Sequence, residues 1–444
     1  MSEISYAIDL TKYCTQVEGF NPVKVNGRVT QVVGLTIEGH LPGTTIGEIC
    51  DIYPRQNGSS IISEVVGFRD NKVLLMPLGE MEGIGPGSRI VAKRQKAVLK
   101  VGNSLLGRVI DGLGNPIDDK EPINANSERS IYSIPINPLH RRLIRETLDL
   151  GVRAINGLLT CGKGQRMGIL SGTGVGKSVL LGMIARNTDA DVNVIALIGE
   201  RGREVREFIE RDLGDEGLRR SVVVVATSDQ PPLIRMRGAY VATAVAEYYR
   251  DQGKQVILMM DSLTRFAMAQ REVGLAIGEP PTTKGYTPSV FSLLPKLLER
   301  AGTCSGDGSI TGLYTVLVEG DDISEPIADA VRSILDGHII LSRALAVQNH
   351  YPSIDVLNSI SRIMIDIITP KHREWANKLT STLSTYKKAE DLINIGAYIK
   401  GSNPGIDYAI EMVDRINAYL KQGIEEKVGF EESVTQLKEL FEKI

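Results

Sequence analysis

The feature that most constrains this chain is a glycine-rich stretch, residues 171–178 (SGTGVGKS), which lies between two apolar runs. The preceding run, residues 167–170 (MGIL), is typical of a buried strand, and the following run, residues 179–186 (VLLGMIAR), is typical of a helix. Glycines let the backbone wrap closely around an anion, so that successive N–H groups and the positive end of the helix point at phosphates. The stretch therefore predicts a phosphate-binding loop.

Individual residues of this loop have expected roles. Lys177 is expected to reach the β- and γ-phosphates of a nucleotide, and the Ser178 hydroxyl to ligate Mg²⁺. The strict G-x-x-x-x-G-K-[ST] pattern has glycine where this chain has Ser171, and we expect a small residue to be tolerated there. The alternative is a glycine-rich turn with a chance Lys-Ser pair, against which the strand and helix on either side argue. The residues predicted to bind nucleotide here are Gly172, Thr173, Gly174, Val175, Gly176, Lys177, Ser178 and Val179.

Two acidic residues follow apolar runs and are candidates for the chemistry. Asp261 follows residues 256–260 (VILMM) and is expected to hold the Mg²⁺ shell, while Glu200 follows residues 194–198 (VIALI) and is expected to orient the attacking water. Arg201, beside it, is a candidate contact to the γ-phosphate. The alternatives are a strand-terminating aspartate in a turn and a solvated cluster of ion pairs.

The hydrophobic pattern divides the chain into parts. A chain of 444 residues is too long for one hydrophobic core. Short β-branched runs broken by glycine fill residues 23–95 and predict a small β-barrel or sandwich. Residues 96–365 alternate apolar strands with helical segments, which predicts an α/β domain with parallel strands. Residues 366–444 carry helical apolar stripes and predict a C-terminal helical domain.

Composition excludes several classes of protein. The net charge is -3 and aromatic residues make up 5%, so nothing indicates a dedicated nucleic-acid partner. The four cysteines are far apart and have no metal-ligand spacing. Since no apolar run approaches the roughly 18 residues needed to cross a bilayer, and the N-terminus has no signal pattern, we expect a cytoplasmic protein.

Several segments together resemble a known family. Residues 171–178, 199–201 (GER) and 259–261 (MMD), with the ten-residue signature at 352–361 (PSIDVLNSIS), resemble the rotary ATPase α/β subunits and their relatives. The likeness extends over nearly the whole chain from about Val23. It implies a multidomain α/β fold, in which an N-terminal β-barrel is followed by a central RecA-like P-loop α/β domain and a C-terminal helical domain.

A narrower resemblance is to the type III protein-export ATPases. It rests on residues 151–166 and 291–302, and residues 231–236 (PPLIRM) with the loop 278–288 resemble the flagellar branch. The alternative within this family is the ATPase of a virulence secretion system.

The resemblance also implies roles for single residues. Glu200 is the catalytic carboxylate, Arg201 a phosphate contact and Asp261 a holder of the Mg²⁺ shell. Tyr351 matches an aromatic that stacks on adenine, although a tyrosine before proline is also ordinary packing. Arg362 matches an arginine finger that enters the neighbouring subunit's site. A second adenine-pocket aromatic corresponds to Tyr419, with Ile424 where another aromatic is often found.

We therefore predict a Mg²⁺-dependent ATPase that energises flagellar protein export as a homohexameric ring. The expected partners are a stator-like negative regulator at residues 1–22, a central stalk protein, export chaperones and substrates, and the membrane export gate. The expected location is the cytoplasmic side of the inner membrane, at the base of the export apparatus. Two rival functions are a hexameric nucleic-acid motor and a non-catalytic nucleotide-binding ring subunit.

Two segments have open interpretations. Residues 4–14 have near-helical apolar spacing and are either a docking helix for a partner or a frayed terminus. The loop 278–288, with three prolines, is either a lining of the central pore or a plain surface loop.

Overall fold

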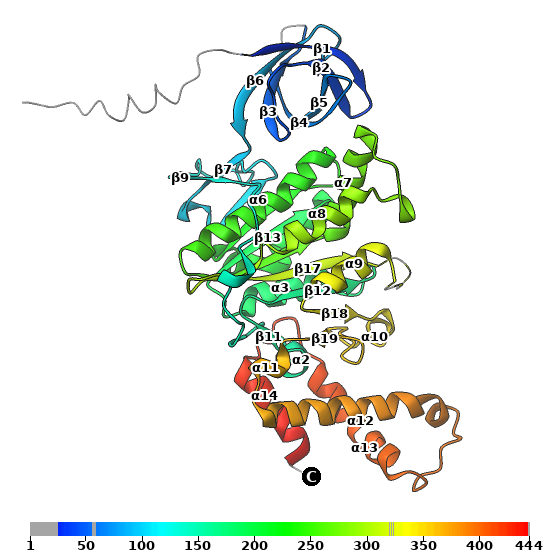
Figure 1. The fold of residues 1–444 in the computed structure, drawn as a ribbon. Coiled ribbons are helices and arrows are strands. Elements are labelled where there is room, and N and C mark those ends of the chain that lie inside the picture. Colours follow the sequence, from blue (N-terminus) through cyan, green and yellow to red (C-terminus); the bar gives the residue numbers. More distant parts are fainter. Residues whose placement is uncertain (1–24, 56–58, 319, 321, 323, 443–444) are drawn as a thin grey trace, which may run out of the picture. The chain divides into compact units, whose positions relative to one another are not determined.

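The computed structural model describes residues 25–442 except 56–58, 319, 321 and 323. The predicted docking segment, residues 1–22, lies outside the described residues. The chain forms two compact units, Met1–Ala97 and Val98–Ile444, and each is considered by itself (Figure 1).

The first unit is a closed antiparallel barrel with the strand order β1-β2-β5-β4-β3-β6. Alternate side chains point inward, as in β3, and the core includes the fully buried Ile37, Ile52, Leu75 and Ile90. Closure pairs every strand on both edges. The predicted barrel is confirmed. Its strands are β1 (Asn26–Val33), β2 (Thr36–His40), β3 (Glu48–Tyr53), β4 (Ile61–Arg69), β5 (Lys72–Pro77) and β6 (Arg89–Lys96).

The second unit is built on a nine-stranded sheet in the order β19-β18-β12-β17-β15-β13-β14-β8, with β16 on β17. From β18 to β8 the neighbouring strands of this path are parallel, and β13 is buried at every position, as expected for a strand covered on both faces. The strands are β8 (Arg108–Asp111), β12 (Arg166–Ser171), β13 (Val192–Ile198), β14 (Ser221–Ala226), β15 (Gln255–Asp261), β16 (Gly302–Thr303), β17 (Ser309–Leu317), β18 (Gly337–Leu341) and β19 (Ile360–Ser361).

Helices cover both faces of this sheet. Figure 1 shows α6, α7 and α8 on one side and α3 on the other, and α6 packs on β13, β14 and β15. The helices are α2 (Arg153–Leu158), α3 (Lys177–Asn187), α4 (Gly202–Glu207), α5 (Gly214–Arg219), α6 (Pro232–Asp251), α7 (Leu263–Ile277), α8 (Pro288–Leu298), α9 (Pro326–Ile334), α10 (Arg343–Val347) and α11 (Met364–Ile367). Short strands β7 (Val98–Val101), β9 (Ser127–Ser130), β10 (Thr147–Leu148) and β11 (Cys161–Gly162) pair at its margins.

The C-terminal part is helical, as predicted, with α12 (Pro370–Asn394), α13 (Pro404–Leu420) and α14 (Phe430–Glu442). Thr369 and Asn403 accept backbone N–H groups of the first turns of α12 and α13, and proline follows each, a combination that favours a helix start. α12 packs on α13, and α14 packs on α2, which joins this part to the sheet domain. In the described residues no helix is both long and apolar enough to cross a membrane.

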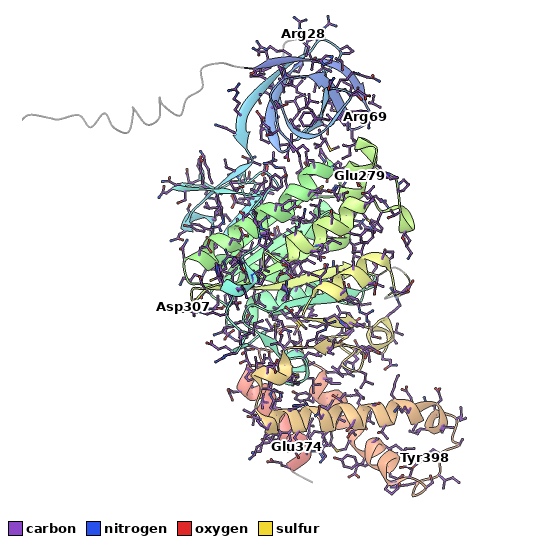
Figure 2. The ribbon with its side chains drawn as sticks, in the orientation of Figure 1. Arg28, Arg69, Glu279, Asp307, Glu374 and Tyr398 are labelled. Atoms are coloured by element: carbon purple, nitrogen blue, oxygen red, sulfur yellow. The ribbon has the colours of Figure 1, made fainter. Side chains whose placement is uncertain are left out.

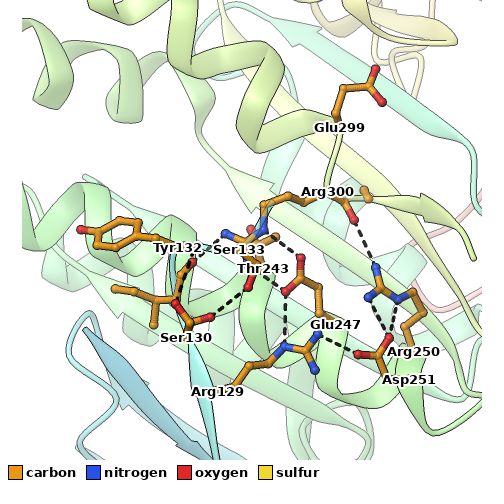
Figure 3. A network of polar contacts seen from close by, with 12 residues as sticks. Arg129, Ser130, Tyr132, Ser133, Thr243, Glu247, Arg250, Asp251, Glu299 and Arg300 are labelled. Atoms are coloured by element: carbon orange, nitrogen blue, oxygen red, sulfur yellow. Dashed lines mark hydrogen bonds and ion pairs between the residues drawn. The ribbon is translucent and has the colours of Figure 1, made fainter. Parts of the chain in front are cut away.

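Figure 2 adds the described side chains to the ribbon of Figure 1. A buried network of charges joins α6 to β9 and to Arg300, which follows the end of α8 (Figure 3). Glu247 of α6 accepts hydrogen bonds from Arg300 Nε at 2.8 Å and Nη2 at 2.9 Å, and from Arg129 Nε at 3.3 Å. Arg300 Nη1 donates to the carbonyl of Ile131 at 2.7 Å. The side chains of Arg300 and Glu247 are only 1% and 3% exposed. Each charge therefore depends on the other, because water cannot replace its partner.

Replacing Glu247 with alanine should lower the free energy of unfolding by about 3–5 kcal/mol, since Arg300 then keeps a buried charge without a counter-ion. Urea unfolding can be followed through Trp375, the chain's one tryptophan, which packs against the core of the same unit. Glu247→Gln should cost less because its amide oxygen still accepts. Glu390→Ala, which removes the surface pair with Lys387, should change stability by less than about 1 kcal/mol. A Glu247→Ala loss no larger than this control contradicts the prediction.

Candidate active site

The phosphate loop connects the end of β12 to the first turn of α3. Gly174 and Gly176 have φ angles of 78° and 90°, a left-handed conformation in which glycine has no steric cost, and Gly176 is the N-cap of α3. Ser353 Oγ donates to the carbonyl of Val175 at 2.6 Å and fixes the loop from outside. The side chain of Val175 belongs to the hydrophobic core, so this residue can contribute only backbone atoms to a ligand.

Parallel neighbours β13 and β15 bring the predicted carboxylates to the same edge of the sheet as this loop. Lys177 Nζ contacts Asp261 Oδ1 directly and lies 3.7 Å from Glu200 Oε1. Thr315 Oγ1 donates to the same Asp261 oxygen at 2.6 Å. Burial alone would lower the pKa of Lys177, but the charges of Asp261 and Glu200 outweigh it and raise this pKa above its usual value. Lys177 therefore stays an ammonium ion, ready for phosphate.

Glu200 has the electrostatics of a proton acceptor near neutral pH. Burial, and then the negative charge of Asp261, raise the pKa of Glu200 to about 7, although Lys177 opposes this shift. Its Oε1 atom is buried and has no hydrogen-bond partner in the described structure. A carboxylate with a pKa close to the working pH and a free buried oxygen is suited to orient and polarise water.

Side chains at the same edge of the sheet also supply oxygen atoms suited to a divalent cation. A recess of about 20 Å³ is bounded by polar side chains of Ser178, Glu200, Glu204 and Asp261, together with apolar groups. Hydroxyl and carboxylate oxygens suit Mg²⁺, which keeps several waters and takes further ligands from phosphates. The described residues contain no cluster of three or more acidic, histidine or cysteine ligands. The oxygen ligands at this site therefore fit a Mg²⁺ ion that arrives with a nucleotide.

The loop opens into a pocket of about 650 Å³, within the usual range for ligand sites. Tyr351 lies beside the loop, because a Cβ placed on Gly176 would be 3.4 Å from its ring, and the tyrosine is 41% exposed. An aromatic face over a phosphate loop can support a nucleobase. The lining residues are Gly172, Thr173, Gly174, Gly176, Lys177, Ser178, Val179, Leu180, Met183, Glu200, Arg201, Glu204, Arg265, Leu317, Tyr351, Pro352, Gln422, Gly423 and Ile424.

Tyr419 is not among the described residues that line this pocket, and its contact with adenine stays a prediction. It is 4% exposed, and its hydroxyl donates to the carbonyl of Ser433 at 3.1 Å. Gly157 leaves room for it, since a Cβ there would be 2.0 Å from the tyrosine oxygen. The helical spacing of Tyr419 with the buried Met412 and Ile416 already indicates a core position.

The two predicted arginines differ in position. Arg201 lines the pocket, and its side chain is 74% exposed and pairs with Glu204. Arg362 is exposed and does not line this pocket in the described structure; its Nη2 donates to the carbonyl of Arg332. The structure thus brings together all the predicted catalytic residues except Arg362.

Arg265 is a pocket residue that the sequence analysis missed. It lies in the first turn of α7, four residues after Asp261. Gly199 leaves space for it, because a Cβ on that glycine would be 2.8 Å from the Arg265 Cβ. Its Nε is buried without a hydrogen-bond partner among the described residues. The signal was a basic residue one turn beyond a predicted metal-holding aspartate, on a helix that starts at the same sheet edge.

Family comparisons agree with this geometry. The nucleotide-binding domain of the ATP synthase alpha/beta family matches residues 151–361, and the beta-barrel domain of that family matches residues 29–93. The T3SS EscN ATPase C-terminal domain matches residues 368–439. The flagellum-specific ATP synthase of Bacillus subtilis (strain 168) is 56% identical over 425 residues, which cover 96% of this chain and 97% of that protein. This chain belongs to the ATP synthase alpha/beta family.

Within the ATP synthase alpha/beta family, its relatives are flagellum-specific ATP synthases and type III secretion ATPases. The flagellum-specific ATP synthase of Treponema pallidum (strain Nichols) is 53% identical, and the alignment covers 96% of both chains. The type 3 secretion system ATPase of Xanthomonas euvesicatoria is 49% identical, and the alignment covers 93% of both chains. The assembled ATPase EscN of enteropathogenic E. coli has a TM-score of 0.89 at 46% identity and covers 93% of this chain and 99% of its own. The predicted class, a flagellar export ATPase, is confirmed.

Kinetic measurements can distinguish the roles of Tyr351 and Tyr419 in this ATP synthase alpha/beta family member. Tyr351→Ala should raise the KM for ATP about tenfold, because one base-stacking face is worth roughly 1–3 kcal/mol. Tyr419→Phe should leave this KM within about twofold and cost about 1 kcal/mol of stability, since it loses only the hydrogen bond to Ser433. Steady-state ATPase assays measure the first effect and unfolding the second. A raised KM for ATP in Tyr419→Phe would indicate that Tyr419 contacts the adenine.

Proposed function

We propose that this chain binds ATP with Mg²⁺ and hydrolyses it as one subunit of a homohexameric ring that drives flagellar protein export. The observation that supports it most directly is the cluster of Lys177, Glu200 and Asp261 at the end of the phosphate loop. Of the two neighbouring carboxylates, Asp261 contacts the lysine directly, while Glu200 Oε1, 3.7 Å from Lys177 Nζ, has no hydrogen-bond partner among the described residues. A non-catalytic nucleotide site does not need this second carboxylate.

In the proposed mechanism the loop N–H groups and Lys177 bind the phosphates, and Tyr351 supports the base. Glu200 accepts a hydrogen bond from the attacking water and orients it toward the γ-phosphorus. The Ser178 hydroxyl and Asp261 would hold Mg²⁺, which when bound would supply positive charge to the phosphate oxygens. Arg201 and Arg265 line the same pocket and contribute positive charge.

The ring follows from a requirement for positive charge. Phosphoryl transfer is accelerated by an arginine that stabilises the transition state, and an enzyme can obtain it from a neighbouring molecule. Arg362, the predicted finger, is exposed and lies outside its own pocket, so we assign it to the neighbour's site. In a closed ring, every subunit can place its arginine in the site of the next subunit.

The partners are proposed from the relatives. EscN has been solved in complex with its central stalk EscO, at a TM-score of 0.86 and 45% identity to this chain. We propose an equivalent stalk for this ring, together with a stator-like regulator on residues 1–22, export chaperones and substrates, and the membrane export gate. The site of action would then be the cytoplasmic base of the export apparatus.

The test is ATPase activity measured against protein concentration, with molecular mass measured in the same samples. Specific activity should rise steeply as the hexamer forms, since each site needs an arginine from its neighbour. Activity that is constant from monomer to hexamer would contradict the ring mechanism. Single-stranded RNA should not stimulate turnover; stimulation would favour a nucleic-acid motor. Absence of turnover at every concentration would favour a non-catalytic subunit.

A further inference from the structure

A short segment after α13 forms part of the wall of the nucleotide pocket. This strap, residues 421–426, is neither helix nor strand, and Gln422, Gly423 and Ile424 within it line the pocket. Gln422 is buried, but residues 423–427 are exposed. Core packing therefore holds little of the outer strap, and its position over the pocket depends on a few hydrogen bonds.

The start of the strap is held by Gln422. Its backbone N–H donates to the carbonyl of Tyr351 at 2.9 Å. Its side chain accepts from the backbone N–H of Arg153 at 2.7 Å and donates to the carbonyl of Gly151 at 2.9 Å. The Arg153 guanidinium also donates to the carboxylate of Glu426. The strap therefore lies beside the tyrosine proposed to support the base, at the base end of the pocket.

The middle of the strap is held by Arg186, in the last turn of α3. Its Nη2 donates to the carbonyl of Ile424 at 2.9 Å, and its Nη1 donates to the carbonyl of Asp212 near the end of the π-helix Phe208–Leu213. These carbonyls lie 238 and 26 positions away in the chain, so one guanidinium joins three separate segments. The Arg186 side chain is 16% exposed, and burial strengthens charge-assisted hydrogen bonds of this kind.

The place of Arg186 on α3 determines which end of the pocket it acts on. Lys177 begins this helix, and Arg186 follows roughly 13 Å further along the axis. Met183, one turn before Arg186 and on the same face of the helix, lines the pocket, whereas Arg186 is not among the described residues that do so. Arg186 is therefore placed to act on a bound nucleotide through the strap and not by direct contact.

We propose that Arg186 is a positioning residue, which holds Ile424 and the rest of the strap closed against the base end of the pocket. This inference rests on the proposed ATP binding and deepens it. If the strap opens, only the closed fraction of the protein has a complete pocket, and the apparent affinity for ATP falls in proportion. The competing explanation is local: a cation in the last turn of a helix interacts favourably with the helix dipole, and the bond to Asp212 supports the fold.

A comparison of ATP with inorganic tripolyphosphate separates these explanations, because tripolyphosphate has the phosphates but no base. Arg186→Ala should raise the KM for ATP about tenfold and keep kcat within about threefold, since it loses a charge-assisted hydrogen bond that orders a pocket wall and not the reacting groups. The inhibition constant of tripolyphosphate, measured at the same Mg²⁺ concentration, should stay within about twofold because Lys177 and its loop are unchanged. Arg186→Lys should recover part of the ATP affinity, since an ammonium lacks the planar fork that serves two carbonyls.

Glu425→Ala is the matched control. The Glu425 carboxylate lies 3.8 Å from Arg186 Nη2 and its side chain is 87% exposed, so this variant removes a neighbouring charge but neither hydrogen bond of the arginine. Its KM for ATP should stay within about twofold. All assays use concentrations at which the hexamer is complete. If Arg186→Ala does not fold, Arg186→Lys carries the same comparison, because it keeps the charge at the helix end.

Two results would overturn the assignment of Arg186. One is an unchanged KM for ATP in both Arg186 variants. The other is a loss of tripolyphosphate inhibition as large as the loss of ATP affinity, which would mean that the arginine supports the phosphate loop or the whole domain. If the wild-type protein binds and hydrolyses ATP while either result is found, the proposed function stands and only the role of Arg186 is wrong. A wild-type protein that binds no ATP would overturn both.

Discussion

Replacing Arg362 with alanine should lower kcat about 1,000-fold, because an arginine finger is worth roughly 10³- to 10⁵-fold in phosphoryl transfer. The reason is electrostatic. Negative charge spreads over the phosphate oxygens in the transition state, and the Arg362 guanidinium, which has no ion-pair partner among the described residues, can respond to it fully. The affinity for ATP in the ground state should change by less than about fivefold, since the loop, Lys177 and Tyr351 remain. Assays are made at concentrations where the hexamer is complete, with binding measured by a fluorescent ATP analogue.

Arg362→Lys should recover little of this activity, because an ammonium cannot reproduce the planar, bidentate contact of a guanidinium. Arg415→Ala is a suitable control: it removes an exposed arginine of α13 whose guanidinium donates to the sulfur of Met412. This control should retain turnover within about twofold, as is usual for an exposed surface substitution. If Arg362→Ala turns over normally, or if it loses ATP binding as strongly as turnover, Arg362 is not a finger.

The sequence was sufficient for features that depend on neighbours along the chain. The loop at residues 171–178, the apolar runs of the parallel strands and the short β-branched runs of the barrel are local patterns, so they predicted the elements correctly. Glu200 and Asp261 were chosen because each follows an apolar run typical of a buried strand, and parallel strands end at one edge of a sheet.

Features that depend on contacts across the fold were missed or left unsettled. Tyr419 was assigned to the base pocket because of a loose family match, whereas its helical stripe buries it against Gly157. Arg265 enters the pocket only because Gly199, on another element, leaves space for it. The hydrogen bond from Arg362 to the backbone carbonyl of Arg332 joins residues 30 positions apart, and no spacing in the sequence indicates it.

Replacing Glu200 with glutamine should lower kcat about 10²- to 10⁴-fold, the usual contribution of a positioned proton acceptor. The amide keeps the size of the carboxyl group but cannot accept a proton from water. ATP binding should be retained or become tighter, since the change removes one negative charge near Lys177 and the phosphates. Single-turnover hydrolysis and equilibrium binding separate the two effects. Glu204→Gln alters another pocket carboxylate, one that pairs with Arg201, and should cost less than about tenfold.

The pH dependence gives an independent test of the same residue. The active form of Glu200 is the carboxylate, and burial raises its pKa to about 7. The value of kcat/KM, which reports the free enzyme, should therefore decline about tenfold per pH unit below pH 7, whereas an exposed glutamate would cause this decline only near its ordinary pKa. In Glu200→Gln the acid limb at pH 7 should disappear from the residual activity, because no titrating group remains at that position. If the limb persists in this variant, another group carries it, and the assignment of Glu200 as the proton acceptor is wrong.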